Sequence, residues 1–345
     1  MPAEWHPHSA TLLHWPSNRS TWPGERLERI EDLFLEIIGH LHRFEPVLLL
    51  AEPSVIARVE QCLGERDLDQ SRIVLADHPV NDIWTRDCGP LFIHKRGSGG
   101  DTYALTDWRY NAWGGKYPPW DGDDAVPEMI AGRYGVPRYG VDLVLEGGAI
   151  ETNGEGLFVT TESVLLNPNR NPGYTRTGIE KALRDYLGAE EVIWLGDGLA
   201  GDDTDGHIDD LCRFLNEETL VTVRASDPDQ VNYHVLEENY RRLRRVAEER
   251  EGGLNLEVLP LPETRIDGVT VDGSEHVPAS YANFYIANGA VLVPLYDERY
   301  DDQALDLIGR YFPDREVIGI RCADLVWGQG GIHCVTQPLY GIGEL

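Results

Sequence analysis

The chain has 345 residues, of which 41% are hydrophobic, and a formal net charge of −29 at pH 7. This charge disfavours nucleic acid and anionic membranes as partners and favours a cationic ligand. No apolar run approaches the roughly 20 residues that a membrane-spanning helix needs.

We expect a cytoplasmic protein with reduced thiols. The first 15 residues lack the basic and apolar segments of a secretory signal. The chain has an odd number of cysteines, which does not suit a disulfide scaffold in a long chain without such a signal. They are Cys62, Cys88, Cys212, Cys322 and Cys334.

A pattern of an apolar strand, a turn, an amphipathic helix and a second apolar strand recurs along the chain. It occupies residues 47–77, 164–197, 220–262 and 291–320. A degenerate copy at 103–158, with its helix near 125–134, brings the count to five. Repeats of this kind usually stack or surround an axis, although ordinary α/β alternation can mimic them. We therefore expect one domain, residues 1–345, built from five strand-strand-helix-strand units.

A polar or glycine-rich stretch follows the second strand of each unit and feeds a further short strand. If the units surround an axis, these stretches meet there. Four of the five carry chemically capable side chains, namely Asp87, Glu146, His207 with Asp209, and Cys334. The pattern therefore predicts one site built from distant parts of the chain.

The segment "GHIDD" places His207 and Asp209 two residues apart, so on an extended backbone both face the same side. A solvated acidic loop is the alternative. The preceding "GDDTD" also suggests a divalent cation site. However, no second histidine pair accompanies it, and a metal would leave Cys334 without a role. We expect neither a metal nor a cofactor.

Cys334 lies in "GQGGIHCVTQP" (328–338), where alternating polarity predicts a strand that begins near Ile332. Most free cysteines are simply buried. With a histidine and carboxylates nearby, a thiolate nucleophile is the better interpretation. On such a strand, His333 faces away from Cys334 and is not the expected base.

Two carboxylates need partners. Glu146 in "VLEGGA" ends an apolar run, where an unpaired carboxylate is costly to bury, and a histidine could be its partner. Asp87 in "WTRDCGP" could form a local ion pair with Arg86, but adjacent residues on a strand face opposite sides.

Seven motifs appear in a familiar order: "MPAEWHPHSATLLHWP", "WTRDCGP", "NAWGGKY", "LEGGAIETNGEG", "LNPNRNPG", "DGHIDD" and "GGIHCVTQ". With them, nearly the whole chain resembles the agmatine deiminases, in the family that includes the bacterial peptidyl-arginine deiminases and within the pentein superfamily. The fold this implies is α/β, a five-bladed α/β propeller with pseudo-fivefold symmetry, in agreement with the five units.

The resemblance also implies roles. Cys334 would attack the guanidinium carbon, His207 would act as general acid and base, and Glu146 would orient His207. Asp87 and Asp209 would hold the guanidinium nitrogens, which suits a planar cation with several donors. Trp84 and Trp113 could line the substrate's alkyl chain, or be core or lid residues.

The activity implied is hydrolysis of agmatine, a small cationic guanidino compound, to N-carbamoylputrescine and ammonia. Gly331 and Asp205 stand where asparagines are typical of the family, and these differences bear on selectivity rather than on chemistry. Alternatives are a deiminase for peptidyl or free arginine, an amidinotransferase, and a propeller that only binds a partner. Assembly into a homo-oligomer is left open.

Overall fold

Five small β-sheets form the framework of the computed structural model, which describes residues 1–97, 100, 102–263, 269–343 and 345. Within each sheet, neighbouring strands are named in order. The four-stranded sheet consists of β16 (Gln337–Leu339), β1 (Ala10–His14), β2 (Val47–Ala51) and β3 (Ile73–Asp77). The three-stranded sheets are β4 (Leu91–Lys95), β5 (Thr102–Arg109) and β6 (Arg138–Val144); β7 (Ile150–Thr152), β8 (Leu157–Thr161) and β9 (Glu191–Leu195); β10 (Cys212–Asn216), β11 (Thr219–Arg224) and β12 (Asn255–Pro260); and β13 (Tyr285–Ile286), β14 (Ala290–Leu295) and β15 (Glu316–Arg321).

The sheets share one pairing pattern. In each three-stranded sheet, the first strand pairs antiparallel with the second, and the second pairs parallel with the third. The four-stranded sheet repeats this with β16, β1 and β2 and adds β3 in parallel. A parallel pair needs a long crossover connection, usually a helix. The mixed pairing therefore accounts for the helix in each predicted unit.

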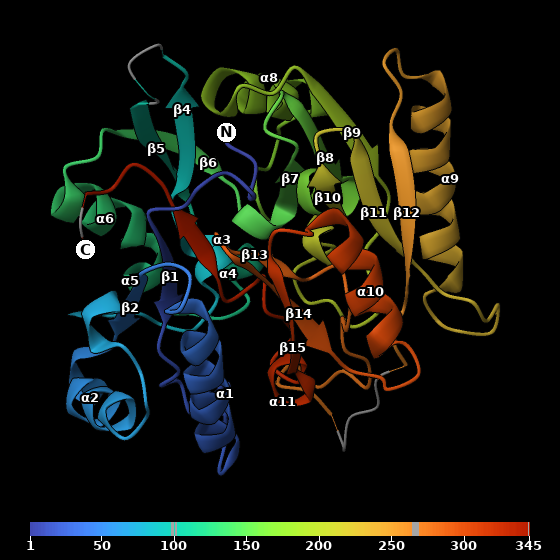
Figure 1. The fold of residues 1–345 in the computed structure, drawn as a ribbon. Coiled ribbons are helices and arrows are strands. Elements are labelled where there is room, and N and C mark those ends of the chain that lie inside the picture. Colours follow the sequence, from blue (N-terminus) through green and yellow to red (C-terminus); the bar gives the residue numbers. More distant parts are fainter. Residues whose placement is uncertain (98–99, 101, 264–268, 344) are drawn as a thin grey trace.

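The long helices lie around the sheets, with α6, α8 and α9 near the edge of the view in Figure 1. They are α1 (Arg26–Leu41), α2 (Ile56–Gly64), α6 (Val126–Tyr134), α8 (Arg176–Leu187), α9 (Tyr233–Glu249) and α10 (Asp301–Tyr311). Single helical turns are α3 (Thr85–Cys88), α4 (Ala112–Gly115), α5 (Asp121–Asp124), α7 (Glu162–Leu165), α11 (Ala323–Val326), η1 (Pro53–Val55), η2 (Gln70–Arg72), η3 (Gly147–Ala149) and η4 (Ile208–Asp210).

Local sequence signals explain where the helices begin and end. In α8, the Thr175 hydroxyl accepts a hydrogen bond from Gly178 N, and Gly188 at the C-terminal end has φ 77°. A threonine N-cap and a left-handed glycine are the usual terminal residues of a helix. Between these ends, Ile179 and Leu183 are buried four residues apart on one face. This amphipathic face fixes how the helix packs.

The five predicted units are confirmed, with two local corrections. The unit expected at 103–158 ends with β6 at Val144, because β7 and β8 belong to the next sheet. The expected strand at residue 164 is wrong, because residues 162–165 form the helical turn α7 and the strand is β8, which ends at Thr161. The Thr161 side chain caps this turn by accepting a hydrogen bond from Val164 N. Val164 and Leu165 are buried all the same. A short apolar run does not distinguish a strand from a buried helical turn.

Each polar stretch singled out in the sequence connects the last strand of one sheet to the first strand of the next. These connections are residues 78–90, 145–149, 196–211, 261–284 and 322–336. The last leads into β16, which pairs with β1 near the other end of the chain. The connections therefore link all five sheets in a closed series.

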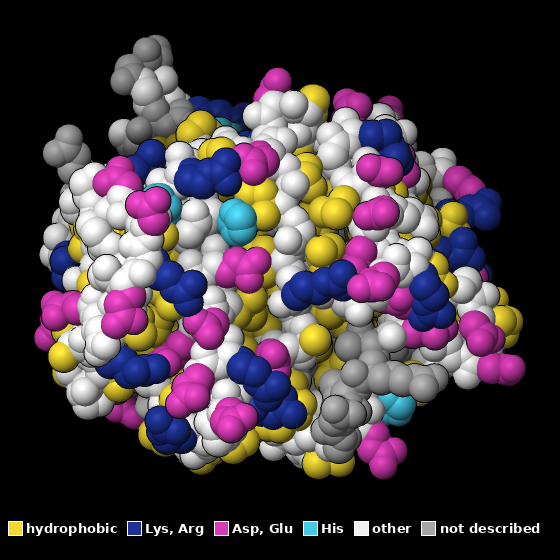
Figure 2. All heavy atoms as spheres, turned by 60° about the horizontal axis from the view of Figure 1, so that its bottom comes forward, with side chains coloured by type: hydrophobic (Ala, Val, Ile, Leu, Met, Phe, Trp, Pro, Cys, Tyr) yellow, Lys and Arg dark blue, Asp and Glu magenta, His cyan; other side chains and the backbone are white. Residues whose placement is uncertain are grey.

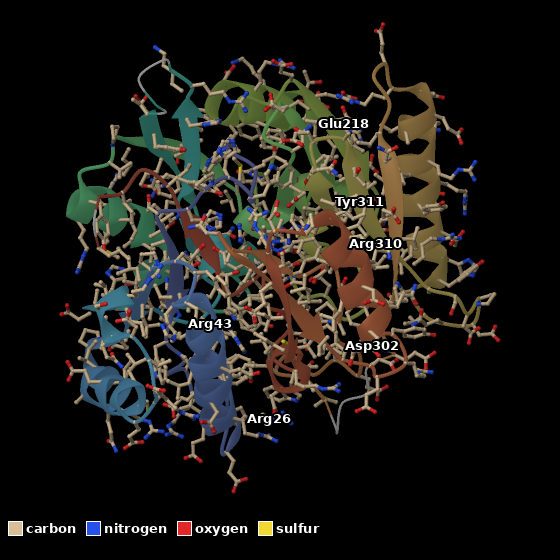
Figure 3. The ribbon with its side chains drawn as sticks, in the orientation of Figure 1. Arg26, Arg43, Glu218, Asp302, Arg310 and Tyr311 are labelled. Carbon is tan, nitrogen blue, oxygen red and sulfur yellow. The ribbon has the colours of Figure 1, made fainter. Side chains whose placement is uncertain are left out.

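Charged side chains of both signs are interspersed on the face shown in Figure 2. Some of them tie the elements together. Arg26 and Arg43 lie near opposite ends of α1 (Figure 3). The Arg26 guanidinium lies 4.1 Å from the ring centroid of Trp327, and Arg43 Nη2 is 2.6 Å from Glu316 Oε2 in β15. In the described part of the chain, no helix is long and apolar enough to span a membrane.

Candidate active site

Side chains from two connections meet beside Gly148, which lies in η3 of a third. A Cβ atom added to this glycine would lie 2.7 Å from His207 Nδ1, 2.8 Å from Asp87 Oδ1 and 3.1 Å from Asp209 Oδ2. These distances leave no room for a side chain at residue 148. The structure thus brings together an imidazole and two carboxylates that are up to 122 residues apart, as 209 minus 87 gives.

Cys334 joins this group from the fifth connection. Its Sγ is 3.7 Å from Asp209 Oδ2 and 3.2 Å from Asn283 Nδ2. The predicted strand from Ile332 is wrong, because residues 332–335 form a turn and β16 begins only at Gln337. The Thr336 hydroxyl donates to Ile332 O at 2.9 Å and closes this turn. The turn presents Cys334 to the site and brings the adjacent His333 into the same network.

Asn283, from the fourth connection, is a member of the site that the sequence analysis missed. Its Oδ1 accepts a hydrogen bond of 2.9 Å from His333 N, and its Nδ2 donates to Asp210 Oδ1 at 2.9 Å. Its position in the chain could have indicated it. The segment "SYANFYIANG" (280–289) follows the second strand of the fourth unit, as the polar or glycine-rich stretches with Asp87, Glu146, His207 and Cys334 follow those of the other units. The amide fixes the backbone that carries the thiol.

His207 immediately precedes η4, so the extended strand assumed for "GHIDD" is wrong, although His207 and Asp209 do reach the same point. His207 Nδ1 is 3.6 Å from Asp87 Oδ1. Burial opposes the imidazolium, but the charges of Asp87, Asp209 and Glu146 outweigh it and raise the pKa of His207. The ring is therefore disposed to hold a proton.

Asp87 lies in the helical turn α3 rather than on a strand. Its Oδ2 accepts from Trp113 Nε1 at 2.9 Å, and its Oδ1 accepts from Gly148 N at 3.0 Å. Burial raises the pKa of Asp87 to about 6. The alternative ion pair with Arg86 is wrong, because the Arg86 guanidinium donates to Glu4 Oε2 at 2.7 Å.

Glu146 has a different partner from the expected histidine. Arg170 Nε donates to Glu146 Oε1 at 2.5 Å, and Arg170 Nη1 donates to Asp205 Oδ2 at 2.5 Å. Asp205 thus shares the arginine with Glu146. Glu146 acts on His207 through its charge, because it raises the pKa of that ring. No local sequence signal indicates Arg170 as the partner.

His333 holds the carboxylate of Asp209. His333 Nδ1 contacts Asp209 Oδ2 at 2.7 Å. Burial raises the pKa of Asp209, but the hydrogen bond and charge of His333 outweigh it, so the net shift is downward. His333 was expected to face away, and the turn that replaces the predicted strand explains why it does not.

A cavity of about 420 Å³ opens onto this group. Asp87 and Cys334 line it, together with Trp84 and Trp113, whose rings meet edge to face with centroids 6.4 Å apart. Trp113 has φ 56° and ψ 41°, an uncommon conformation for a bulky residue that indicates a functional constraint. His207, Asp209 and Glu146 are buried and are not part of its lining.

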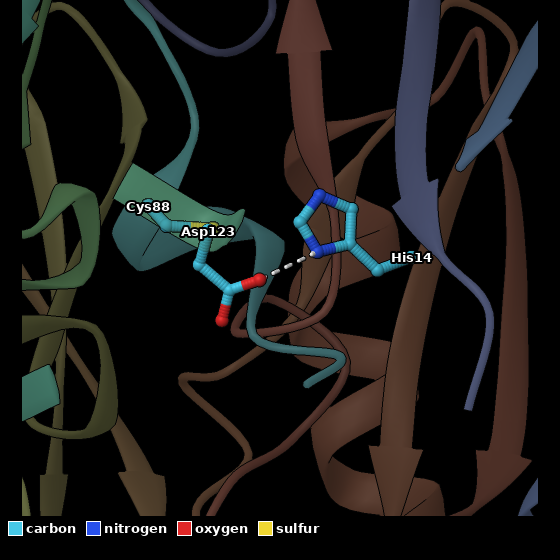
Figure 4. Close-up of side chains that lie close together, drawn as sticks. All are labelled: His14, Cys88 and Asp123. Atoms are coloured by element: carbon cyan, nitrogen blue, oxygen red, sulfur yellow. Dashed lines mark ion pairs between the residues drawn. The ribbon is translucent and has the colours of Figure 1, made fainter. Parts of the chain in front are cut away.

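His14, Cys88 and Asp123 form a second buried cluster (Figure 4). Their candidate ligand atoms lie within 4.8 Å of one another, as they would around a metal ion. Each of them nevertheless holds the backbone of one loop: His14 Nδ1 contacts Asp82 O at 3.0 Å, Asp123 Oδ1 accepts from Asn81 N at 2.8 Å, and Cys88 Sγ contacts Trp84 O at 3.5 Å. These contacts give the cluster a structural role, which is to fix the loop that leads to Asp87.

The thiol of Cys334 is not activated by its fixed surroundings. Burial raises the pKa of Cys334 well above its usual value, and the charges of Asp209, Asp210 and Asp87 raise it further. A bound cation would offset these charges. A buried thiol, an imidazole and several carboxylates at the inner end of a cavity, on five mixed α/β sheets, define a thiol-dependent site for a cationic ligand.

Comparison with known proteins agrees with this class. The sequence profile of the Porphyromonas-type peptidyl-arginine deiminases matches residues 1–339. The agmatine deiminase of Pseudomonas aeruginosa (strain LESB58) is 35% identical over 355 residues, which cover 98% of this chain and 94% of that protein. The chain therefore belongs to the Porphyromonas-type peptidyl-arginine deiminase family.

Solved structures show the same fold. The agmatine deiminase of Enterococcus faecalis superposes with a TM-score of 0.88 at 31% identity and covers 98% of this chain and 95% of its own. The agmatine deiminase of C. jejuni gives a TM-score of 0.85 at 28% identity, with coverages of 99% and 96%.

Proposed function

We propose that this protein is an agmatine deiminase, which hydrolyses agmatine to N-carbamoylputrescine and ammonia. One observation carries the proposal. Within the described part of the chain, four buried atoms of this site have no hydrogen-bond partner, namely Glu146 Oε2, Asp209 Oδ1 and both ring nitrogens of His207. Unpaired polar atoms are costly to bury. Two of the four are carboxylate oxygens, and a guanidinium, with five N–H donors in one plane, is the cation best suited to them.

Asp87 and Asp209 hold the guanidinium from two sides in this proposal. Trp113 and Gly148 fix the Asp87 carboxylate, and His333 fixes that of Asp209. Because both carboxylates are held by other groups before substrate arrives, little reorganisation accompanies binding. The clamp places the guanidinium carbon within reach of the Cys334 sulfur, which is the proximity that the addition step needs.

The chemistry is covalent catalysis by the thiolate. Cys334 adds to the guanidinium carbon, His207 gives a proton to the departing ammonia, and a thiouronium remains on the sulfur. His207 then takes a proton from water, which attacks the same carbon. The carbon–sulfur bond breaks, so that the thiolate and the ureido product are released. This sequence uses protein groups and water, without a metal or cofactor.

Substrate binding itself helps to form the nucleophile. The three carboxylates around Cys334 disfavour the thiolate in the empty site. A guanidinium between Asp87 and Asp209 brings a positive charge close to sulfur and lowers the cost of ionisation. His207, whose pKa is raised, is then ready as the proton donor.

The outer cavity favours an amine over a carboxylate at the far end of the substrate. Asp82, Asp123 and Asp203 line it. Burial raises the pKa of Asp203 to about 7, and the hydrogen bond from Tyr117 and the charge of Lys116 offset only part of this rise. The lining cation, Lys116, already contacts Asp205 Oδ1 at 2.8 Å. The ammonium of agmatine suits this surface, whereas the α-carboxylate of free arginine does not.

Trp84 and Trp113 form part of the cavity wall between the carboxylates. Their apolar faces suit the methylene chain of agmatine, and a ring next to a cation adds a favourable interaction. Trp113 also donates to Asp87, so it links the wall to the guanidinium clamp. Trp84 packs closely on Gly330, where an added Cβ would lie 2.3 Å from the ring.

The test is ammonia release from agmatine, with free arginine and an arginyl peptide in parallel and a metal chelator present throughout. Release from agmatine alone is the expected result. Cys334→Ala removes the nucleophile and should abolish turnover, whereas Cys62→Ala, at a half-buried cysteine in α2, is the matched control and should leave it intact. Release from the peptide alone would contradict agmatine as the substrate, and activity of Cys334→Ala would contradict Cys334 as the nucleophile.

The same proposal covers the remaining features. We infer that the five sheets are the blades of one propeller, a single catalytic domain of residues 1–345, because β16 closes on β1 and the five connections supply the site. The five cysteines are all free thiols, which suits the cytoplasm. The net charge of −29 suits a small cation rather than nucleic acid or membrane as partner. Homo-oligomer formation stays a prediction.

A further inference from the structure

His333 lies between two buried carboxylates, one in the site and one near the N-terminus. Its Nδ1 is 2.7 Å from Asp209 Oδ2, and its Nε2 is 2.9 Å from Glu4 Oε2. All three side chains are buried. Because Asp209 Oδ2 is also 3.7 Å from Cys334 Sγ, one series of contacts leads from residue 4 to the thiol.

Glu4 is held as a carboxylate by four donors. Apart from His333, they are Arg86 Nη2 at 2.7 Å, Arg213 Nη2 at 2.8 Å and Ile286 N at 2.9 Å. An ionised carboxylate offers about four acceptor positions, so Glu4 is saturated. Burial raises the pKa of Glu4, but the charges of Arg213, His333 and Arg86 outweigh it and hold the pKa well below its usual value.

Both ring nitrogens of His333 contact a carboxylate oxygen. A neutral imidazole carries one N–H and could donate to only one of them. Glu4 already accepts from two guanidinium groups and a backbone N–H, as an ionised carboxylate does. Donation to both carboxylates requires a hydrogen on each ring nitrogen, which makes the bridging ring a cation.

This cation matters to Asp209 because most of its other neighbours are acidic. The groups that act on Asp209 electrostatically are His207, His333 and Arg213 on the favourable side, and Asp87, Asp202, Asp210 and Cys334 on the unfavourable side. His333 occupies Oδ2, and Oδ1 has no hydrogen-bond partner in the described part of the chain. Asp209 Oδ1 is therefore the oxygen left for a guanidinium N–H.

We propose that Glu4 and His333 are positioning residues for the substrate clamp, in which Glu4 keeps His333 doubly protonated and His333 keeps Asp209 ionised with Oδ1 free for the substrate. The proposal rests on the deiminase function proposed above and extends it to two residues that do not touch the substrate. It also gives the N-terminal segment, which carries Glu4, a positioning role.

The kinetic test compares the pH dependence of kcat and KM for agmatine in the wild type, Glu4→Gln and His333→Gln. His333→Gln keeps a donor for Asp209 but removes the charge, so Asp209 becomes easier to protonate. We expect KM to rise by about tenfold or more. On the acid limb of kcat/KM, the lower of two ionisations, that of Asp209, should move up by about one pH unit towards that of Asp87 at about 6, since an opposite charge typically shifts a pKa by one to three units. Glu4→Gln should shift the limb in the same direction by less.

Glu151→Gln is the matched control. Glu151 is buried in the same network, where its Oε2 accepts from Arg213 Nε at 2.9 Å and its Oε1 accepts from Phe214 N at 3.0 Å. Its hydrogen bonds involve neither His333 nor Asp209. The control should lower the thermal stability and leave the acid limb in place. Equal shifts in all three variants, or no shift in His333→Gln, would reduce the role of His333 to structure and overturn the proposal.

A second measurement does not depend on substrate or on the folding of buried-charge variants. Nitrogen NMR of ¹⁵N-histidine-labelled protein reads ring protonation directly, and His207→Asn removes the other site histidine from the spectrum. We expect the assigned ring of His333 to stay doubly protonated at pH 8. Assignment is needed because His8 also has both ring nitrogens against acceptors, at 3.1 Å from Glu45 Oε1 and 2.6 Å from Glu4 O. A neutral His333 ring would overturn the proposal. A doubly protonated His333 in a protein that releases no ammonia from agmatine would instead refute the deiminase function alone.

Discussion

Gly148→Ala tests whether the point where the side chains meet is the catalytic centre. The added Cβ would lie 2.7 Å from His207 Nδ1, 2.8 Å from Asp87 Oδ1 and 3.1 Å from Asp209 Oδ2. A Cβ atom essentially never lies closer than 3.0 Å to such an atom and rarely closer than 3.4 Å, so the three groups must move apart by several tenths of an ångström. A misplacement approaching 1 Å costs on the order of 100-fold in rate. We therefore expect kcat/KM for agmatine to fall about 100-fold.

Overpacking of this kind also costs about 1–3 kcal/mol of stability. Gly132→Ala in α6 is the matched control, because its Cβ would meet no atom within 4 Å and alanine favours a helix by about 0.5–1 kcal/mol. This control should keep full activity and equal or higher thermal stability. The assay is ammonia release at several agmatine concentrations, together with thermal unfolding. A folded Gly148→Ala enzyme with wild-type kcat/KM would refute the placement of the site.

Three further predictions concern the carboxylates and the thiol. Asp203→Asn should lower kcat/KM for agmatine by about 10- to 150-fold, the equivalent of about 1.5–3 kcal/mol for a charge-assisted hydrogen bond. It should leave kcat/KM for butylguanidine, which lacks the amine, unchanged. Equal losses for the two substrates would exclude a contact between Asp203 and the amine. Ultraviolet thiolate absorbance at neutral pH should appear only when a guanidino ligand binds, and a Cys334 thiolate already present in the empty enzyme would contradict the proposed activation. Burial raises the pKa of Asp123 from 3.8 to about 8. The folded state therefore holds the carboxyl proton of Asp123 more tightly than the unfolded state, and the protein loses stability as pH rises between these values. Denaturant unfolding of Asp123→Asn should show a smaller loss of stability over that range, and an unchanged loss would mean that other groups cause it.

The sequence by itself determined the modular plan of the protein. Each unit reveals itself through hydrophobic periodicity and turn residues, which act within a few tens of residues. The strand at 47–51 and the helix at 126–134 were therefore predictable almost to the residue. The positions of Asp87, His207 and Cys334 at equivalent points of the units indicated a shared site before any contact was known.

Only the tertiary structure decided how these side chains are held. The turns at Asp87, His207 and Cys334 replaced predicted strands, because hydrogen bonds to other connections, such as Arg86 N to Cys334 O at 3.1 Å, compete with local extended structure. The partners of the charged groups were equally out of reach. His333 and Glu4 are 329 residues apart, and Glu146 pairs with Arg170 rather than with a histidine. Buried charges pair by proximity in space and by exclusion of water, and a linear sequence specifies neither.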